Sequence, residues 1–118
     1  MEELLIEMPR GDLQLVHFEV IDEETGEVST VDFTQIYFSV KKSIYDAGVL
    51  FQKTLSEGGI MKLGTGEYQI EILPEDTTDL GFGEYKFDIE FIFEDTVHKT
   101  IMGRLIIGPE ITCAWNEG

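Results

Sequence analysis

The chain has 118 residues, the length of one domain, and its 42% hydrophobic content is too high for a disordered chain. It carries 24 Asp and Glu against 8 Lys and Arg, a formal net charge of -16. Such a surface repels phosphate backbones and anionic lipid, so the composition argues against nucleic acid and membranes as partners. It favours proteins with basic patches.

The cysteine count and the N-terminus restrict the chemistry and the compartment. A lone Cys113 excludes an intramolecular disulfide and a multi-thiolate zinc site. The start, MEELLIEMPRG, is acidic where a signal peptide is basic, and no stretch approaches the ~20 apolar residues of a membrane span. We therefore expect a soluble chain that is made in a cytoplasm and has no export signal of its own. We expect no cofactor.

The first half of the chain predicts three strands, DLQLVHFEVID, QIYFSVKK and VLFQKTLS. In each, apolar side chains recur at alternate positions, as in a half-buried strand. These positions are Val16, Phe18 and Val20, then Ile36, Phe38 and Val40, and then Val49, Phe51 and Leu55. Lys53 interrupts the third strand, and the glycine-containing segments EETGE and EGGI predict turns.

The second half predicts three more strands, GEYQIEIL, EYKFDIEFIF and TVHKTIMGRLIIG. The inward positions of the first two are Tyr68, Ile70 and Ile72, and then Tyr85, Phe87, Ile89, Phe91 and Phe93. The opposite face of EYKFDIEFIF carries charge at Lys86, Asp88 and Glu90, and a period this close to two excludes a helix. In the last strand, Gly103 indicates a bulge or a point of close approach.

No helical pattern of any length occurs, and the best helical candidates are the single turns KSIYDAG and PEDTTDLG. Short strands at regular spacing with turns between them predict an all-β, antiparallel, immunoglobulin-like β-sandwich of about seven strands. We expect one domain over residues 1–118, with loose order at residues 1–9 and 113–118.

The segment LPEDTTDLGFGEYKF predicts the corner between two strands of such a sandwich. Pro74 ends one strand, Asp and Thr side chains cap a single turn, and Leu80 packs under the sandwich. Gly81 and Gly83 allow the reversal, and Tyr85 begins the next strand, where its hydroxyl should bond to backbone a few residues upstream. The carboxylates here are interpreted as capping and solubilising groups.

Candidate catalytic and metal-binding residues are sparse. There is no G-x-S-x-G motif, and His17 and His98 fall in separate predicted strands as half-exposed residues. The acidic segments DEETGE and PEDTTDLGFGE lack the spacing of a calcium loop. The tripeptide RGD at Arg10–Asp12 matches an integrin-binding motif, but a turn before the next strand is the favoured interpretation. An enzyme is not expected.

Four segments together resemble a phage-encoded family of small immunoglobulin-like proteins, similar to the N-terminal domain of the phage baseplate upper protein. They are RGD, FSVKKS, VLFQKTLSEGGI and GEYQIEILPEDTTDLGFGEYKFDIE, and the closing GRLIIGPEIT also fits. The resemblance spans roughly residues 10–112, and its most specific part is the T-x-x-L-x-x-G-x-Y-x-F-D-I pattern from Thr77 to Ile89. It implies a structural part of a virion or prophage, with no catalysis.

In the baseplate protein this domain precedes a longer chain. Since the present chain ends after the domain, we expect a free-standing accessory protein of head, neck or tail.

The expected function is therefore that of a non-enzymatic interaction module whose partners are other phage particle proteins. Its expected location is the virion, or the host cytoplasm before assembly. Ile92, an apolar residue on a charged strand face, and Trp115 are the candidate contact residues. Two alternatives stay open, a carbohydrate- or cell-surface-binding adhesion module and a calcium-binding domain that uses the acidic loops. The sequence also leaves open whether the chain forms a homo-oligomer.

Overall fold

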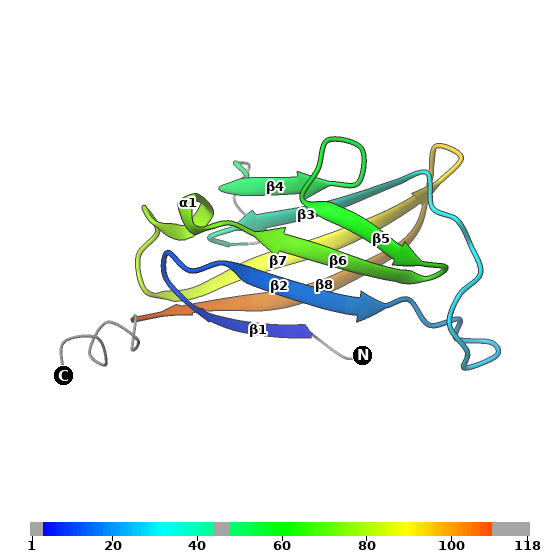
Figure 1. Ribbon diagram of the computed structural model, residues 1–118, viewed down its shortest axis with the longest axis horizontal. Helices are drawn as coiled ribbons and strands as arrows, with labels where there is room; N and C mark the ends of the chain where they lie inside the picture. The colour runs from blue at the N-terminus through cyan, green and yellow to red at the C-terminus, as the bar shows by residue number, and fades with distance from the viewer. Residues whose placement is uncertain (1–3, 44–47, 110–118) are drawn as a thin grey trace.

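The computed structural model describes residues 4–43 and 48–109, apart from the side chain of His98. Within these ranges the chain forms eight strands and one short helix, arranged as two sheets (Figure 1). The elements are β1 (Leu4–Pro9), β2 (Gln14–Glu19), β3 (Gln35–Lys41), β4 (Phe51–Thr54), β5 (Ile60–Gly64), β6 (Glu67–Ile72), α1 (Pro74–Thr77), β7 (Gly83–Phe93) and β8 (Thr96–Gly108). None of the described helical residues forms a segment long and apolar enough to cross a membrane.

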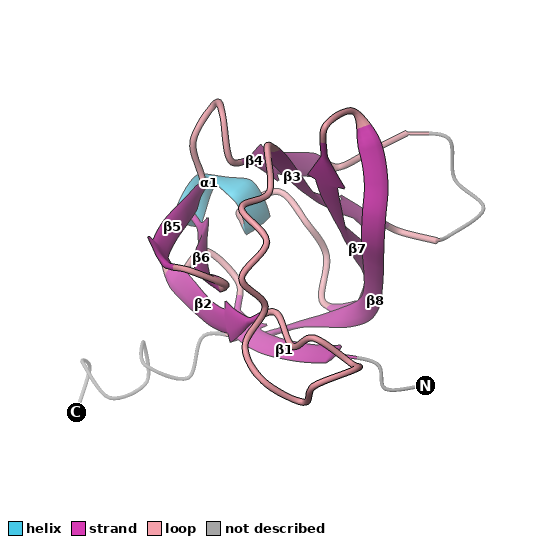
Figure 2. Ribbon diagram, turned by 90° about the vertical axis from the view of Figure 1, so that its right-hand side faces the viewer, coloured by secondary structure: helices cyan, strands magenta, loops and turns pink. Residues whose placement is uncertain are grey.

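The two sheets face each other as a sandwich (Figure 2). The larger has the strand order β1-β8-β7-β3-β4, and the smaller has the order β2-β6-β5. All neighbouring strands are antiparallel except β1 and β8, which are parallel with Leu4 opposite Gly103. The predicted all-β, immunoglobulin-like sandwich is confirmed, with one parallel pair and one more strand than expected.

The extra strand corrects the expectation of a loosely ordered N-terminus. Leu4–Pro9 form β1, whose Ile6 and Met8 are buried in the core. β1 pairs with residues of β8 that lie about a hundred positions away in the sequence. No turn between neighbouring segments could therefore have predicted this pairing. The other predicted loose end, residues 113–118, lies outside the described residues, as does most of the expected turn KSIYDAG.

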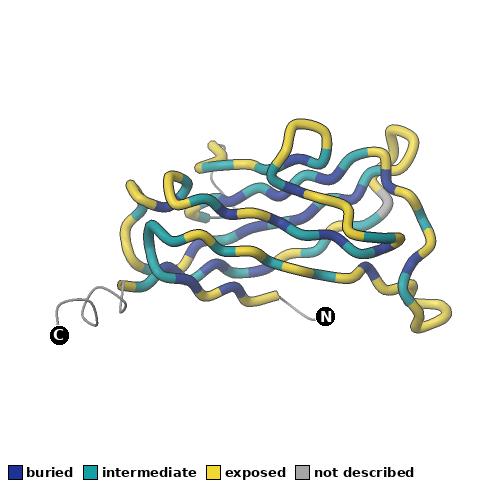
Figure 3. The backbone as a smooth tube through the Cα atoms, in the orientation of Figure 1, coloured by how far each residue is buried: buried dark blue, intermediate teal, exposed yellow. Residues whose placement is uncertain are grey.

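The core lies between the sheets and follows the predicted alternation (Figure 3). In β3, β6 and β7 every second side chain is buried, because successive residues of a strand point to opposite faces. The aromatic part of the core comes from both sheets. Phe38 and Phe87 of the larger sheet lie with ring centroids 5.2 Å apart, and Phe18 and Tyr68 of the smaller sheet stack at 5.8 Å. This burial supplies the main stabilising free energy of the fold.

Two predicted core positions are wrong. Phe93 is 38% exposed, because the register between β7 and β8 shifts between Phe91 and Ile92 and ends the alternation. Val49 is 43% exposed, because β4 begins only at Phe51. The bulge therefore lies at Phe91 and Ile92 rather than at Gly103.

Gly103 is instead a point of close approach. It is buried opposite Phe87, and a Cβ placed on it would overlap the Phe87 ring and lie 2.6 Å from the Leu4 carbonyl oxygen. The missing side chain thus makes room for an aromatic ring of the core and for the backbone of β1.

Candidate interaction surface

The corner predicted from the sequence is present between β6 and β7. Pro74 opens α1, Leu80 is partly buried against the core, and Gly83 begins β7 with a positive φ of 135°. The Tyr85 hydroxyl donates a 2.7 Å hydrogen bond to the Gly81 carbonyl oxygen. This is the backbone bond expected of a tyrosine at this corner, and it ties the start of β7 to the loop before it.

One corner carboxylate has a larger structural role than capping. Asp76 accepts a 2.7 Å hydrogen bond from the Leu73 backbone N–H at the start of α1. Its Oδ2 also lies 2.6 Å from the Lys53 ammonium, and the two side chains are only 14% and 11% exposed. Lys53, which interrupts the apolar pattern of β4, therefore points inward and links the larger sheet to the turn that follows the smaller one.

The RGD tripeptide forms the turn between β1 and β2, as favoured from the sequence. Its Gly11 N–H donates to the buried Thr77 hydroxyl at 2.8 Å. The Arg10 guanidinium lies 4.4 Å from the centroid of the Phe82 ring and donates to the Leu80 carbonyl oxygen at 3.3 Å. The tripeptide thus holds the turn against the corner.

The remaining candidate residues are not brought together into one site. Ile92 is partly buried and lies at the register shift, opposite Val97. His17 is 54% exposed on the outer face of β2, with its Nε2 atom 3.7 Å from Glu67. His98 belongs to β8, but its side chain is outside the description, as are Trp115 and Cys113. Among the described residues, no group of three or more His, Cys, Asp or Glu is placed to hold a metal ion.

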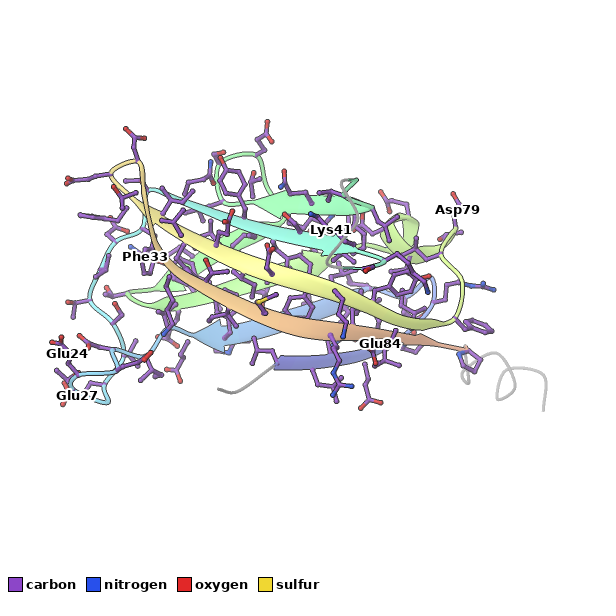
Figure 4. The ribbon with its side chains drawn as sticks, turned by 180° about the vertical axis from the view of Figure 1, so that it is seen from behind. Glu24, Glu27, Phe33, Lys41, Asp79 and Glu84 are labelled. Carbon is purple, nitrogen blue, oxygen red and sulfur yellow. The ribbon has the colours of Figure 1, made fainter. Side chains whose placement is uncertain are left out.

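A feature that the sequence did not predict lies on the outer face of the larger sheet. Lys41 of β3 is opposite Lys86 of β7, and Lys86 is opposite Arg104 of β8. We name these three residues the cationic row. They are three of the eight Lys and Arg residues of the chain. Figure 4 shows this face, with Lys41 and Glu84 in the half nearer the corner and Glu24 and Glu27 at the other end.

Acidic neighbours balance the cationic row only in part. Glu84 contacts the Lys86 ammonium at 2.8 Å and the Arg104 guanidinium at 3.3 Å, and the pKa of its carboxyl is lowered, chiefly by the hydrogen bond from Lys86. Lys41 makes no such hydrogen bond or ion pair to a described residue. It lies close enough to Asp88 to favour the charged form of that carboxyl.

Beside the cationic row lies a shallow hollow of about 110 Å³, here named the polar hollow. Its walls are formed by Ser39, Lys41, Lys86, Phe87, Asp88 and Met102. Burial raises the pKa of the Asp88 carboxyl, and the nearby Lys41 opposes this rise without cancelling it. The hollow combines two ammonium groups, a poorly hydrated carboxyl and an apolar methionine.

A second hollow lies at the opposite end of the sandwich and measures about 370 Å³. Its floor is apolar, formed by Val20, Val31 and Phe33, and acidic residues 22–24 line its edge. The Lys99 ammonium also lines it and donates to the Ile21 carbonyl oxygen at 3.2 Å. It has the size of a small-ligand pocket.

The cationic row could have been found from the sequence only with the strand register. Lys41 and Lys86 stand on the outward parity of their strands, but their pairing depends on which residues of β3 and β7 are opposite each other. The outward charges of β7 can be read from the sequence, but only the register aligns them with those of β3 and β8.

Comparisons with known proteins add little to this geometry. No protein-family model matches the chain, and no curated protein matches it. Among solved structures, the NK cell receptor Nkp44, described as a triggering partner in natural cytotoxicity, is similar with a TM-score of 0.48 and 14% sequence identity. The similarity covers 92% of this chain and 100% of the receptor chain. The architecture of this chain is therefore established by its own strand order, as an all-β, immunoglobulin-like sandwich.

Proposed function

We propose that this protein is a non-enzymatic interaction module and a structural or accessory part of a phage particle. It binds other particle proteins through the outer face of its larger sheet. The observation that carries the proposal is the cationic row, which gathers Lys41, Lys86 and Arg104 at consecutive cross-strand positions in a chain of net charge -16.

One pair of the cationic row supports binding because its like charges oppose the fold. Like charges directly opposite each other on a sheet destabilise it. Lys41 and Lys86 are such a pair, and among the described residues only Lys86 has a carboxylate partner within bonding distance. A surface that carries this cost and also holds a desolvated carboxyl at Asp88 is better suited to a partner than to water.

The role in a phage particle rests on the sequence resemblance to the baseplate family. The corner that carries much of that resemblance is built from Pro74, Leu80 and Tyr85 and supports an immunoglobulin-like scaffold. Rigid sandwiches of this kind present sheet faces and end loops to other proteins, which is what a particle component requires.

The test is whether the chain belongs to particles. Particles made by the phage that encodes it are purified on a density gradient and probed with an antibody to the chain. The proposal predicts that the chain sediments with intact particles and that immunogold labels one defined part of them. A chain found only in the particle-free fraction, with normal particles lacking it, would overturn the proposed role.

A further inference from the structure

We propose that the cationic row and the polar hollow form a binding site for an extended, carboxylate-bearing segment of a partner protein. This inference rests on the proposed function and specifies the chemistry of its contact. The bound segment crosses β3, β7 and β8, and its carboxylates pair with Lys41 and Lys86.

The positions of the cations fit such a segment. Lys41, Lys86 and Arg104 come from three adjacent strands, so the backbones of neighbouring members of the row are about 4.8 Å apart and those of the outer two about 10 Å apart. In an extended chain, alternate residues point to the same side at intervals of about 7 Å. Two acidic side chains at alternate positions therefore fit within the length of the row.

The polar hollow provides complementary contacts for the rest of the segment. Met102 can pack against the methylene groups of an acidic side chain whose carboxylate reaches Lys41. Asp88, opposite Ser39 and Met102, lines the same hollow, and its carboxyl can accept a backbone N–H of the bound segment. Such a bond would compensate for the poor hydration that raises the pKa of Asp88.

The surroundings of the row favour a protein segment over a nucleic acid. Glu84 lies on one side of the row and Glu90, two residues beyond Asp88, on the other. A phosphate backbone carries a charge at every step and would meet these carboxylates as soon as it left the row. A peptide with a few carboxylates and otherwise neutral residues can place its carboxylates on the cations and its backbone N–H groups on Asp88.

The test is a binding titration followed by amide chemical shifts of the whole chain in 0.15 M salt, where charges more than about 8 Å away are largely screened. The probe is a blocked hexapeptide of alternating glutamate and alanine, and the control probe replaces each glutamate with glutamine. We expect the glutamate peptide to shift amides of β3, β7 and β8 around the polar hollow. The glutamine peptide should leave them unchanged.

Variants then assign the contact to the cationic row. Lys41→Gln with Lys86→Gln should weaken binding of the glutamate peptide at least tenfold. Lys62→Gln should have no such effect, because Lys62 pairs with Asp32 away from this face. The melting temperatures of all variants show that they are folded.

Several results would overturn the inference. These are the absence of shifts with the glutamate peptide, shifts elsewhere on the molecule, and binding unaffected by the double substitution. Equal or tighter binding of an oligothymidylate at the same residues would assign the row to nucleic acid instead. Concentration-dependent association that the double substitution abolishes would assign it to a second copy of this chain. In each case, co-sedimentation with particles would still support the proposed place of the chain in the particle.

Discussion

The Tyr85 hydroxyl donates a 2.7 Å hydrogen bond to the Gly81 carbonyl oxygen, four residues earlier in the chain. Tyr85 is otherwise buried in the core. We expect Tyr85→Phe to lower the free energy of unfolding by about 1 kcal/mol, because the carbonyl loses its partner while the packing is kept. Urea denaturation measures the change.

The matched control is Tyr68→Phe, in a second buried tyrosine. The Tyr68 hydroxyl is buried without a hydrogen-bond partner among the described residues, although the Phe33 backbone lies nearby. Its removal should cost less stability than removal of the Tyr85 hydroxyl, because at most a weak contact with the Phe33 backbone is lost and a polar group leaves the core. Equal losses in both variants would mean that the corner bond contributes nothing specific.

The ion pair between Lys53 and Asp76 predicts strong coupling between β4 and the turn after β6. Its partners are largely shielded from solvent, and Asp76 also accepts the Leu73 N–H. We expect Asp76→Ala to cost about 2 kcal/mol or more, because it leaves a shielded ammonium and a backbone N–H without partners. A double-mutant cycle with Lys53→Ala should give a coupling energy of at least about 1 kcal/mol. Additive losses would contradict a direct interaction.

Gly103→Ala should destabilise the fold by about 1–3 kcal/mol, because the new methyl group would overlap the Phe87 ring and crowd the Leu4 carbonyl oxygen. Gly108→Ala, near the end of the same strand, is the control, since a Cβ there meets nothing within 4 Å. Thermal unfolding of the two variants should differ clearly. Similar melting temperatures would show that β1 and Phe87 move aside easily.

Asp88 and Glu84 should respond to pH in opposite directions. Burial raises the pKa of Asp88 in the native state, with Lys41 of β3, Lys86 of its own strand and Met102 of β8 around it. Since the native state then holds its proton more tightly than the unfolded state, the ionised carboxyl costs stability at pH 7. Asp88→Asn should therefore raise the free energy of unfolding at pH 7. The gain should shrink as the pH falls through the raised pKa.

Replacing Glu84 should change the stability at pH 7 in the opposite direction. The hydrogen bond from Lys86 and the nearby Arg104 lower the pKa of the Glu84 carboxyl. Its carboxylate stabilises the native state above the unfolded pKa, and this stabilisation is lost as the pH falls through the lowered native value. Glu84→Gln should thus reduce stability at pH 7 and have little effect in acid. Urea denaturation over a pH series checks both variants, and effects of the same sign would contradict these local environments.

The sequence predicts the sandwich well because most of its evidence is local. The alternation of β7 and the corner from Pro74 to Tyr85 follow from strand geometry and turn chemistry within a few residues. The parallel strand β1 escaped prediction because its partner, β8, is distant in sequence. The Phe93 error has a similar cause, since a register shift depends on the partner strand.

The candidate surface could not be predicted from the sequence, because it also depends on the register between strands. The sequence predicts Ile92 as a contact residue because it is apolar among charges, but the structure places it at the bulge, away from the cationic row. Nothing in the sequence alone sets Lys41 and Arg104 apart from other charged strand residues. Only the cross-strand register aligns them with Lys86.

Incorporation of a charge-reversed chain into particles tests the central claim most directly. Particles are assembled with the wild-type chain, with Lys41→Glu and Lys86→Glu combined, or with Lys62→Glu as a control on the smaller sheet, and the amount of chain per purified particle is measured. We expect that the doubly reversed chain folds but that its amount per particle falls at least tenfold, while the control is retained. Equal incorporation of all three chains would contradict an interaction through the cationic row.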